Sequence, residues 1–290
     1  MINRLKYSLV KFLEKIPYLQ FIIYNNLVNF KFLLPHDKDY LGLKLLFKKN
    51  EVGTFLDIGG NIGLSTLSFR QMGFKNNEIL IFEPDKYLIK KYLNKLKIQD
   101  KKIKIYPFGL SNRTQLKLLY KASYKKLKIH VNNSFSKKYI YEKIKNNYPD
   151  KYKLFKYTKT KYELKIFDNI NLDKNISFIK IDVEGYDHFV LEGMKKFLKK
   201  NNPVFLIEFN KSNFMRIWKK LKNKYLCYTF DIEKKSFTRF SNTKISNLMK
   251  GYIFDKRYNK NSINFFLIPK KFKIKFLYEK LLQDKLLQNM

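Results

Sequence analysis

The chain of 290 residues has one cysteine, Cys227, only three histidines and no long uninterrupted apolar run. A single cysteine excludes an internal disulfide, and no Cys/His spacing suggests a zinc site. The most apolar stretch near the start, residues 16–35, is broken by three asparagines and a lysine, whereas a helix that spans a bilayer needs about 20 apolar residues. The sequence therefore predicts neither a transmembrane helix nor a signal peptide, and we expect a cytoplasmic protein.

Arginine is scarce as well, since only six of the 61 basic residues are arginine. Proteins that read nucleic acids favour arginine for bidentate and stacking contacts, so nucleic acid is not the partner we expect. The formal net charge of +37 comes from lysines spread over the whole chain, which we interpret as a solvated basic surface. Attraction to an anionic lipid or glycan is the alternative. With 45% hydrophobic residues the chain has enough apolar material for a folded core.

Apolar segments of strand length alternate with segments of helical spacing along most of the chain. Strands are predicted over 55–58, 78–82, 103–108, 176–183 and 204–209, with helices over 64–72, 86–96, 186–199 and 214–222. Strands separated by helices of about ten residues predict a parallel sheet with right-handed crossovers. Two late strands are predicted over 225–230 and 263–268, joined by a polar loop.

Three segments depart from this alternation. Residues 1–50 predict an N-terminal helical and strand extension, and residues 271–290 a basic amphipathic C-terminal helix. Between them, residues 51–270 form the predicted α/β domain. Within it, residues 120–165 have short runs rich in lysine, tyrosine and asparagine, which we interpret as an insertion or an antiparallel excursion. The amphipathic ends leave open a peripheral contact with the inner face of the membrane, and self-association.

A glycine turn follows the first predicted strand, with the pattern Asp57-x-Gly59-Gly60-Asn61-x-Gly63. A strand, glycine turn and helix together present backbone N–H groups to a nucleotide-like ligand. The turn is neither Gly-x-Gly-x-x-Gly nor a phosphate loop, and its leading acid would repel a pyrophosphate but suits an ammonium or sulfonium group. Glu83, at the end of the second strand, is spaced to accept both hydroxyls of a ribose. These two acids favour S-adenosylmethionine as the ligand.

A second group of acids follows the next pair of predicted strands. Asp182 and Glu184 are one residue apart, so alternation should point them the same way, and Glu208 ends the following strand. All three should lie near the glycine turn, because ligands bind at the carboxyl ends of parallel strands. Asp182, Glu184 and His188 are candidate bases for a hydroxyl proton. Three alternatives remain open. Asp182, Glu184 and Glu208 could hold Mg²⁺, Glu184 could cap a helix, and His188 could be an exposed or satisfied surface histidine.

Six motifs stand in a fixed order along the chain: Leu-Asp-Ile-Gly-Gly-Asn-Ile-Gly (56–63), Phe-Glu-Pro (82–84), Phe-Gly-Leu-Ser-Asn (108–112), Phe-Ile-Lys-Ile-Asp-Val-Glu-Gly (178–185), Val-Leu-Glu-Gly (190–193) and Pro-Val-Phe-Leu-Ile-Glu (203–208). In this order they resemble the FkbM family of methyltransferases, and the resemblance runs from about residue 30 to residue 269. It implies an α/β, Rossmann-like class I methyltransferase fold. Such a fold has a mostly parallel seven-stranded sheet with helices on both faces and a final antiparallel strand.

The resemblance also implies a set of cofactor-binding residues: Asp57, Gly59, Gly60, Asn61, Gly63, Glu83, Pro84, Ser111 and Asp182. The usual alanine of the turn is Gly60 here, a change expected to add room. Family members methylate hydroxyls of sugars and natural products, and residues 120–162 match the family poorly, so acceptor recognition is expected there. We predict an S-adenosylmethionine-dependent O-methyltransferase acting on a surface glycan or glycolipid. The alternatives are an RNA or protein acceptor, or a non-catalytic membrane-surface protein on this fold.

Overall fold

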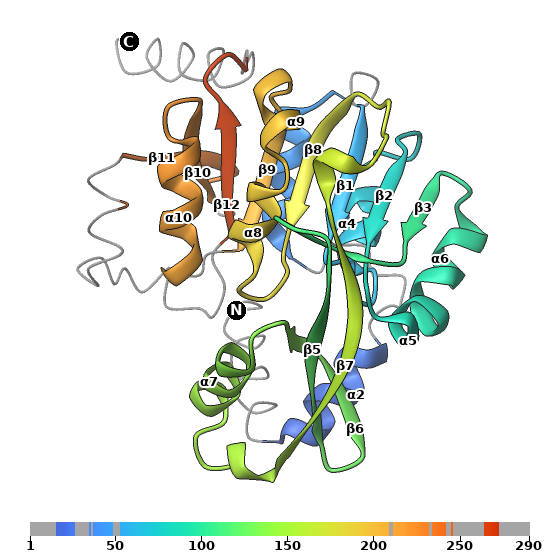
Figure 1. Cartoon of the computed structure of the whole chain (residues 1–290). Helices are drawn as coiled ribbons and strands as arrows, with labels where there is room; N and C mark the ends of the chain where they lie inside the picture. Colours follow the sequence, from blue (N-terminus) through green and yellow to red (C-terminus); the bar gives the residue numbers. More distant parts are fainter. Residues whose placement is uncertain are drawn as a thin grey trace.

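A computed structural model describes residues 16–26, 35, 37–48, 53–208, 211–231, 234–241, 245 and 264–272. Its architecture consists of two β-sheets: a large sheet flanked by helices, and a smaller sheet that extends away from one end of it (Figure 1). The predicted C-terminal helix, beyond residue 272, and much of the predicted N-terminal extension lie outside the described residues.

The large sheet has eight strands in the order β11-β10-β12-β9-β8-β1-β2-β3. Its parallel part consists of β1 (Thr54–Ile58), β2 (Ile79–Phe82), β3 (Ile103–Tyr106), β8 (Ile176–Ile181) and β9 (Val204–Glu208). Antiparallel pairing then adds β12 (Asn264–Pro269), β10 (Tyr225–Asp231) and β11 (Ser236–Phe240). The predicted mostly parallel sheet is thus confirmed, with an antiparallel strand next to its parallel part.

The predicted number of seven strands is wrong, because β11 lies within the segment that was predicted to be a polar loop. Phe237 and Phe240 of β11 are buried, and the strand forms a hairpin with β10. Lys234, Lys235 and Arg239 surround these aromatic residues and give the segment its polar character in the sequence.

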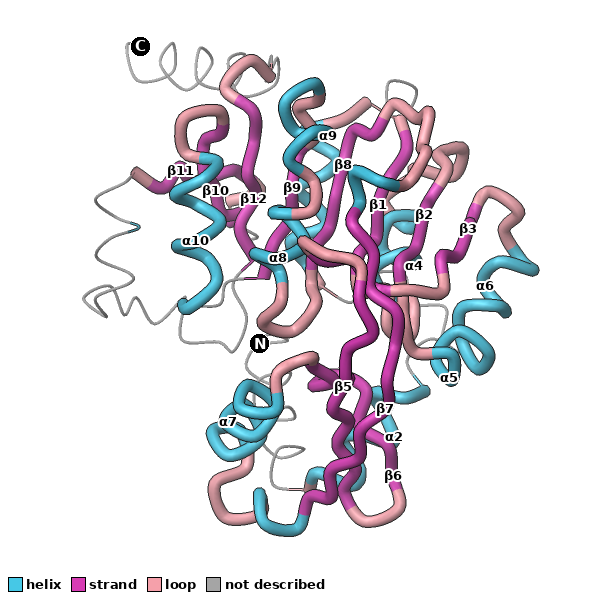
Figure 2. Tube along the Cα trace, viewed as in Figure 1, coloured by secondary structure: helices cyan, strands magenta, loops and turns pink. Residues whose placement is uncertain are grey.

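Helices cover both faces of the large sheet (Figure 2). They are η2 (Lys38–Gly42), α3 (Leu43–Leu46), α4 (Leu64–Gln71), α5 (Lys86–Leu88), the π-helix η3 (Ile89–Leu93), α6 (Asn94–Gln99), α8 (Asp187–Glu192), α9 (Lys195–Lys200) and α10 (Lys211–Leu221). Neighbouring residues of β1 divide between two cores: Leu56 and Ile58 pack with α8 and α10, whereas Phe55 packs with α3 and α4. Burial on both faces explains why the parallel strands are continuous apolar runs.

The small sheet has the order β4-β7-β5-β6. Its strands are β4 (Gly109–Ser111), β5 (Gln115–Tyr124), β6 (Leu127–Ser134) and β7 (Phe155–Ile166), with α7 (Lys137–Asn147) and η4 (Tyr152–Leu154) between β6 and β7. β5 pairs antiparallel with both β6 and β7, in agreement with the interpretation of an antiparallel excursion. The sheet begins before residue 120, however, because β4 and most of the first half of β5 precede it.

The far end of the small sheet has its own core. Helix α2 (Pro17–Asn26) packs there, and Phe21 lies in a buried cluster with Ile140 and Ile144 of α7 and Phe155 of β7. The short helix η5 (Phe167–Asn169) then leads the chain from β7 back to the large sheet. Within the part of the chain that the structure describes, no helix is long and apolar enough to cross a membrane.

Candidate active site

The glycine turn connects β1 to α4 and requires a special backbone. Gly59 has φ +84° and Gly63 has φ +90°, and a Cβ atom at Gly59 would lie 2.0 Å from the carbonyl oxygen of Asp182. Asn61, with φ +49°, donates its backbone N–H to Glu83 Oε2 over 2.8 Å and its side-chain Nδ2 to the carbonyl of His130 over 3.2 Å. The turn is thereby joined to the end of β2 and to β6 of the small sheet.

Gly60 does not add room to this turn, so that expectation is wrong. A Cβ atom at Gly60 would lie 2.2 Å from Cγ2 of Ile81, a methyl group on the branched carbon of a neighbouring strand residue. Ile81 fills the space that an alanine side chain would need, and the glycine is a packing requirement of this chain.

Glu83 lies at the end of β2, where the sequence predicted a ribose acceptor. Its Oε2 accepts from the Asn61 N–H, its Oε1 accepts from the Asp85 N–H over 2.8 Å, and the side chain is buried. Burial raises the pKa of Glu83 to about 7, while the two backbone hydrogen bonds lower it. Each oxygen retains a second lone pair, so this fixed carboxylate can still accept hydrogen bonds from hydroxyl groups. Pro84, next to it, is buried.

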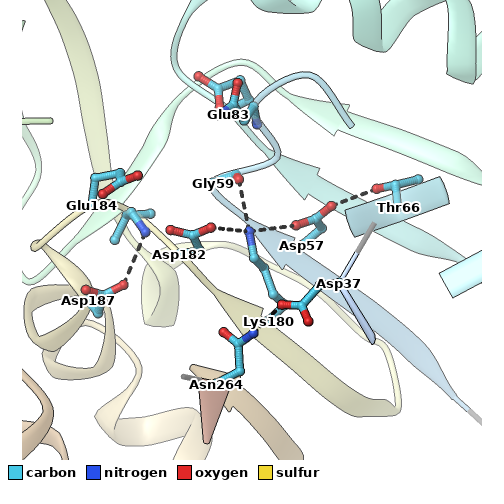
Figure 3. Close-up of polar contacts among 12 residues, drawn as sticks. Asp37, Asp57, Gly59, Thr66, Glu83, Lys180, Asp182, Glu184, Asp187 and Asn264 are labelled. Carbon is cyan, nitrogen blue, oxygen red and sulfur yellow. Dashed lines mark hydrogen bonds and ion pairs between the residues drawn. The ribbon is translucent and has the colours of Figure 1, made fainter. Parts of the chain in front are cut away.

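Asp57 lies under the turn and is fully buried (Figure 3). Its Oδ2 accepts a hydrogen bond of 2.8 Å from Thr66 Oγ1 on α4, and its Oδ1 is 3.9 Å from Lys180 Nζ. Burial raises the pKa of Asp57, whereas the Lys180 charge and the Thr66 hydrogen bond lower it. The carboxylate therefore holds α4 to β1, in addition to any effect of its charge on a ligand.

Lys180 is one of several site residues that the sequence prediction did not include. It is the register partner of Asp57 across the β1–β8 pair, and its Nζ lies 3.1 Å from Asp182 Oδ2 and 3.4 Å from the Gly59 carbonyl. Burial lowers the pKa of Lys180, but the charges of Asp182 and Asp57 outweigh it and the net direction is upward. Its signal was present in the sequence, because it is the one charged residue in the apolar run 176–181. Lys180 thus balances the negative charge of Asp57 within the protein.

Asp182, Glu184 and Glu208 do come together, as predicted. One carboxylate oxygen of each lies within 4.8 Å of the others. The reason is different from the predicted strand alternation, because β8 ends at Ile181 and the chain then turns at Glu184 (φ +50°) and Gly185 (φ +86°).

The pKa values of Asp182 and Glu208 are shifted in opposite directions. Burial raises the pKa of Asp182, but Lys180, Lys143 and a hydrogen bond from Glu208 lower it further, so its net direction is downward. Burial and the charge of Asp182 hold the pKa of Glu208 well above its usual range. Of these two carboxyls, Glu208 therefore holds a proton more readily than Asp182 does.

Glu184 is held by residues of the small sheet. Lys143 Nζ of α7 lies 2.5 Å from Glu184 Oε2, and the Tyr139 hydroxyl donates to the same oxygen over 3.2 Å. Burial raises the pKa of Glu184 to about 7, and the Lys143 charge opposes the rise. The Tyr139 ring also occupies the space beside Gly185, where a Cβ atom would lie 2.7 Å from it. Only the tertiary contact reveals these two residues, since nothing in the sequence connects α7 with Glu184.

A second contact fastens the small sheet beside Glu83. Asp85 is almost fully buried, and its Oδ2 lies 2.7 Å from Lys121 Nζ of β5. The Tyr162 hydroxyl of β7 donates to Asp85 Oδ1 over 3.0 Å, and Lys121 donates to that hydroxyl over 2.7 Å. The sequence prediction did not include Asp85, Lys121 or Tyr162.

Two predicted site residues have their contacts elsewhere. His188 Nε2 lies 3.0 Å from Arg216 Nη1 of α10, and burial followed by the Arg216 charge lowers the pKa of this histidine. The structure does not bring His188 to Glu184, whose partners are on α7. Ser111 is fully buried and its hydroxyl donates to Asn112 Oδ1 over 3.3 Å, so its hydroxyl is turned to its neighbour.

A family model for the methyltransferase FkbM domain matches residues 57–254. The chain belongs to the FkbM methyltransferase family. Among solved structures it is similar to the methyltransferase FkbM from Methylobacillus flagellatus, with a TM-score of 0.43 and 14% identity over 74% of this chain and 43% of that chain. It is also similar to precorrin-6y C5,15-methyltransferase from Geobacter metallireducens, with a TM-score of 0.37 and 10% identity over 79% of this chain and 84% of that chain. A comparison with curated proteins found no match.

Membership of the family implies S-adenosylmethionine as the methyl donor, and the charges of the site fit that donor. Within the part of the chain that the structure describes, Lys143 and Lys180 form ion pairs with three of six carboxyl groups that influence one another's pKa: Asp57, Glu83, Asp182, Glu184, Asp187 and Glu208. Asn61 Oδ1 and Asp182 Oδ1 are buried acceptors without a hydrogen-bond partner. A locally acidic site with spare acceptors in a strongly basic chain suits a ligand with a sulfonium, an ammonium and hydroxyl groups.

We expect Lys180→Met to lower the free energy of unfolding near neutral pH by about 3–5 kcal/mol, because it leaves Asp57 and Asp182 without their buried cation. Burial already raises the pKa of Asp57, and loss of Lys180 raises it further. The native variant then takes up a proton as the pH falls, so its deficit should shrink in mild acid. Urea unfolding at both pH values measures this. Lys180→Arg is the control that keeps the charge, and equal stability of Lys180→Met and wild type would contradict the assigned role.

Proposed function

We propose that this protein transfers the methyl group of S-adenosylmethionine to a sugar hydroxyl of a glycan or glycolipid. The donor supplies an electrophilic methyl group on a sulfonium centre. A sugar hydroxyl is a weak nucleophile unless a base accepts its proton as the new bond forms. The observation that carries the proposal is the partly buried Glu184 carboxyl, which Lys143 and Tyr139 hold beside Asp182 and Glu208 and whose pKa is raised to about 7.

The donor side is supplied by the large sheet. Glu83 is fixed by two backbone N–H groups and would accept the ribose hydroxyls. Asn61, within the turn, has a spare Oδ1, and the half-buried carboxylate of Asp182 lies beyond the end of β8. We assign Asp182 to the ammonium group, because it is the ionised member of the acid cluster.

Glu184 is the base we assign, in preference to Asp182 and His188. Lys143 and Tyr139 both contact Oε2, so Oε1 is the oxygen that accepts the hydroxyl proton. Asp182 is a weaker base because its pKa is lowered, and His188 has its contacts on α10. Lys143 stays charged throughout and balances the carboxylate before the proton arrives.

The acceptor side is supplied by the small sheet, which supports a glycan as substrate. Residues 156–161 of β7 are all exposed and alternate lysines with tyrosine and threonines. Tyr141, Tyr152 and Tyr157 form a chain of ring contacts at 5.9 and 6.3 Å. Polar side chains and tyrosine rings with an apolar face and a hydroxyl suit sugar rings, and the lysines suit an anionic glycan.

Binding of S-adenosylmethionine tests the donor side. We expect Glu83→Ala to weaken binding at least about a hundredfold, because two hydrogen bonds to a charged group are lost. Titration calorimetry measures the affinity, and Glu163→Ala, which removes an exposed glutamate of β7, is the matched control. Unchanged affinity in Glu83→Ala would refute the site, and a methyl group lost from host glycans on deletion of the gene would identify the acceptor.

The pH dependence of kcat tests the base. Glu184 works when ionised, so kcat should rise through a pH of about 7 and level off above it. Lys143→Met removes the charge that opposes the raised pKa, so the rise should move to higher pH. Glu184→Gln should lower kcat by about 10²–10⁴ with donor binding kept. Lys138→Met, at an exposed lysine of the same helix, is the control; if its profile and that of Lys143→Met coincide, Glu184 is not the base.

A divalent cation at Asp182, Glu184 and Glu208 is the alternative use of the acids. Their oxygens are close enough for a hard cation, but Lys180 and Lys143 lie 3.1 and 2.5 Å from two of the three carboxylates and balance their charges. We therefore expect EDTA to leave the rate unchanged and added Mg²⁺ to have no effect. A stimulation by Mg²⁺ that Glu208→Gln abolishes would assign the acids to a cation.

A further inference from the structure

Exposed apolar side chains gather at one end of this molecule. Four of the nine large exposed hydrophobic residues in the described part of the chain lie on or beside a single helix, α2, at the far end of the small sheet: Ile16, Tyr18, Leu19 and Ile23. This end points away from the large sheet (Figure 1). Such a concentration, on a chain that is otherwise rich in charge, indicates a surface that meets an apolar partner.

Helix α2 is apolar on two opposite sides. Phe21 is buried and contacts the rings of Tyr148 and Phe155 at 5.8 and 6.2 Å. At 100° per residue, Ile16, Leu19 and Ile23 project from the side opposite Phe21, and each is 39% exposed. We call these three residues the α2 stripe. The helix itself, Pro17–Asn26, has no charged residue, so no charge on it opposes insertion into an apolar medium.

A cationic turn flanks the α2 stripe. Lys125 and Lys126 form the tight turn between β5 and β6, and both are exposed. Lys125 Nζ lies 5.6 Å from the centre of the Tyr18 ring, which places this turn next to α2. An apolar stripe, a half-exposed tyrosine and adjacent lysines are together the features of a helix that lies in a membrane interface.

We propose that the α2 stripe and the Lys125–Lys126 turn dock this protein on an anionic lipid bilayer. The stripe would enter the boundary between headgroups and acyl chains, Tyr18 would lie at headgroup level, and the lysines would meet lipid phosphates. A second copy of the chain is the less suitable partner, because pairing would bring two lysine turns and two charges of +37 together. The inference does not depend on the acceptor proposed above.

Vesicle flotation of the full chain tests the proposal. Wild type should float with vesicles of equal parts phosphatidylcholine and phosphatidylglycerol, and should stay bound when salt is raised, because salt does not screen apolar insertion. Leu19→Asp/Ile23→Asp should lower the bound fraction in high salt at least about tenfold. Lys125→Glu/Lys126→Glu should lower binding in low salt. Ile98→Asp changes an exposed isoleucine on α6 and should bind as wild type does.

Two results would overturn the proposal. In one, Leu19→Asp/Ile23→Asp and Ile98→Asp bind anionic vesicles equally in high salt. In the other, wild type forms a dimer in sedimentation that the stripe variant abolishes, with no vesicle binding by either. Thermal melting of each variant checks the fold, and Leu19→Ser/Ile23→Ser provides a milder change at the same two exposed positions.

Discussion

The ammonium group of Lys180 is the interaction on which the site depends. It lies between Asp57 at the end of β1 and Asp182 beyond the end of β8, and it donates to the carbonyl of Gly59. One buried cation therefore balances two carboxylates and ties the glycine turn to the loop that follows β8. Asp57 in turn holds α4 through Thr66. Because a buried charge without a partner is costly, the strand register that pairs Asp57 with Lys180 fixes the geometry of everything around the turn.

The small sheet completes the site from the opposite side. Its side chains hold two acids that follow strands of the large sheet: Lys121 and Tyr162 hold Asp85, and Lys143 and Tyr139 hold Glu184. The first contact lies beside the proposed ribose acceptor and the second at the proposed base. The two halves of the proposed reaction thus have different origins: donor binding comes from the parallel strands, and the environment of the base comes from α7.

The sequence predicted those parts of the structure that depend on local pattern. The parallel strands, the turn at Gly59–Gly63 and the place of Glu83 follow from periodicity and from the rule that parallel strands end at one edge. The same rule brings Asp182, Glu184 and Glu208 to one edge, although a turn at Glu184 and Gly185, which the sequence did not predict, sets their arrangement. The rest depends on tertiary contacts. No spacing connects Lys143 with Glu184, and the fit of Gly60 against Ile81 involves two strands. The charged residues near Phe237 and Phe240 made the β11 segment resemble a polar loop. His188 contacts α10 because that face of its helix is the buried one.

Residues 109–166, which form the small sheet, include positions that tolerate substitution and positions that do not. The exposed stretch 156–161 contributes no buried side chain, so it can change in composition without a cost to folding. Lys121 and Lys143 cannot, because each balances a buried carboxylate that belongs to the other sheet. An exchange of this segment between relatives would therefore transfer the proposed acceptor surface only if these two lysines were transferred with it. A change of acceptor in this fold would thus depend on Lys121 and Lys143, two charged residues that need not contact the acceptor.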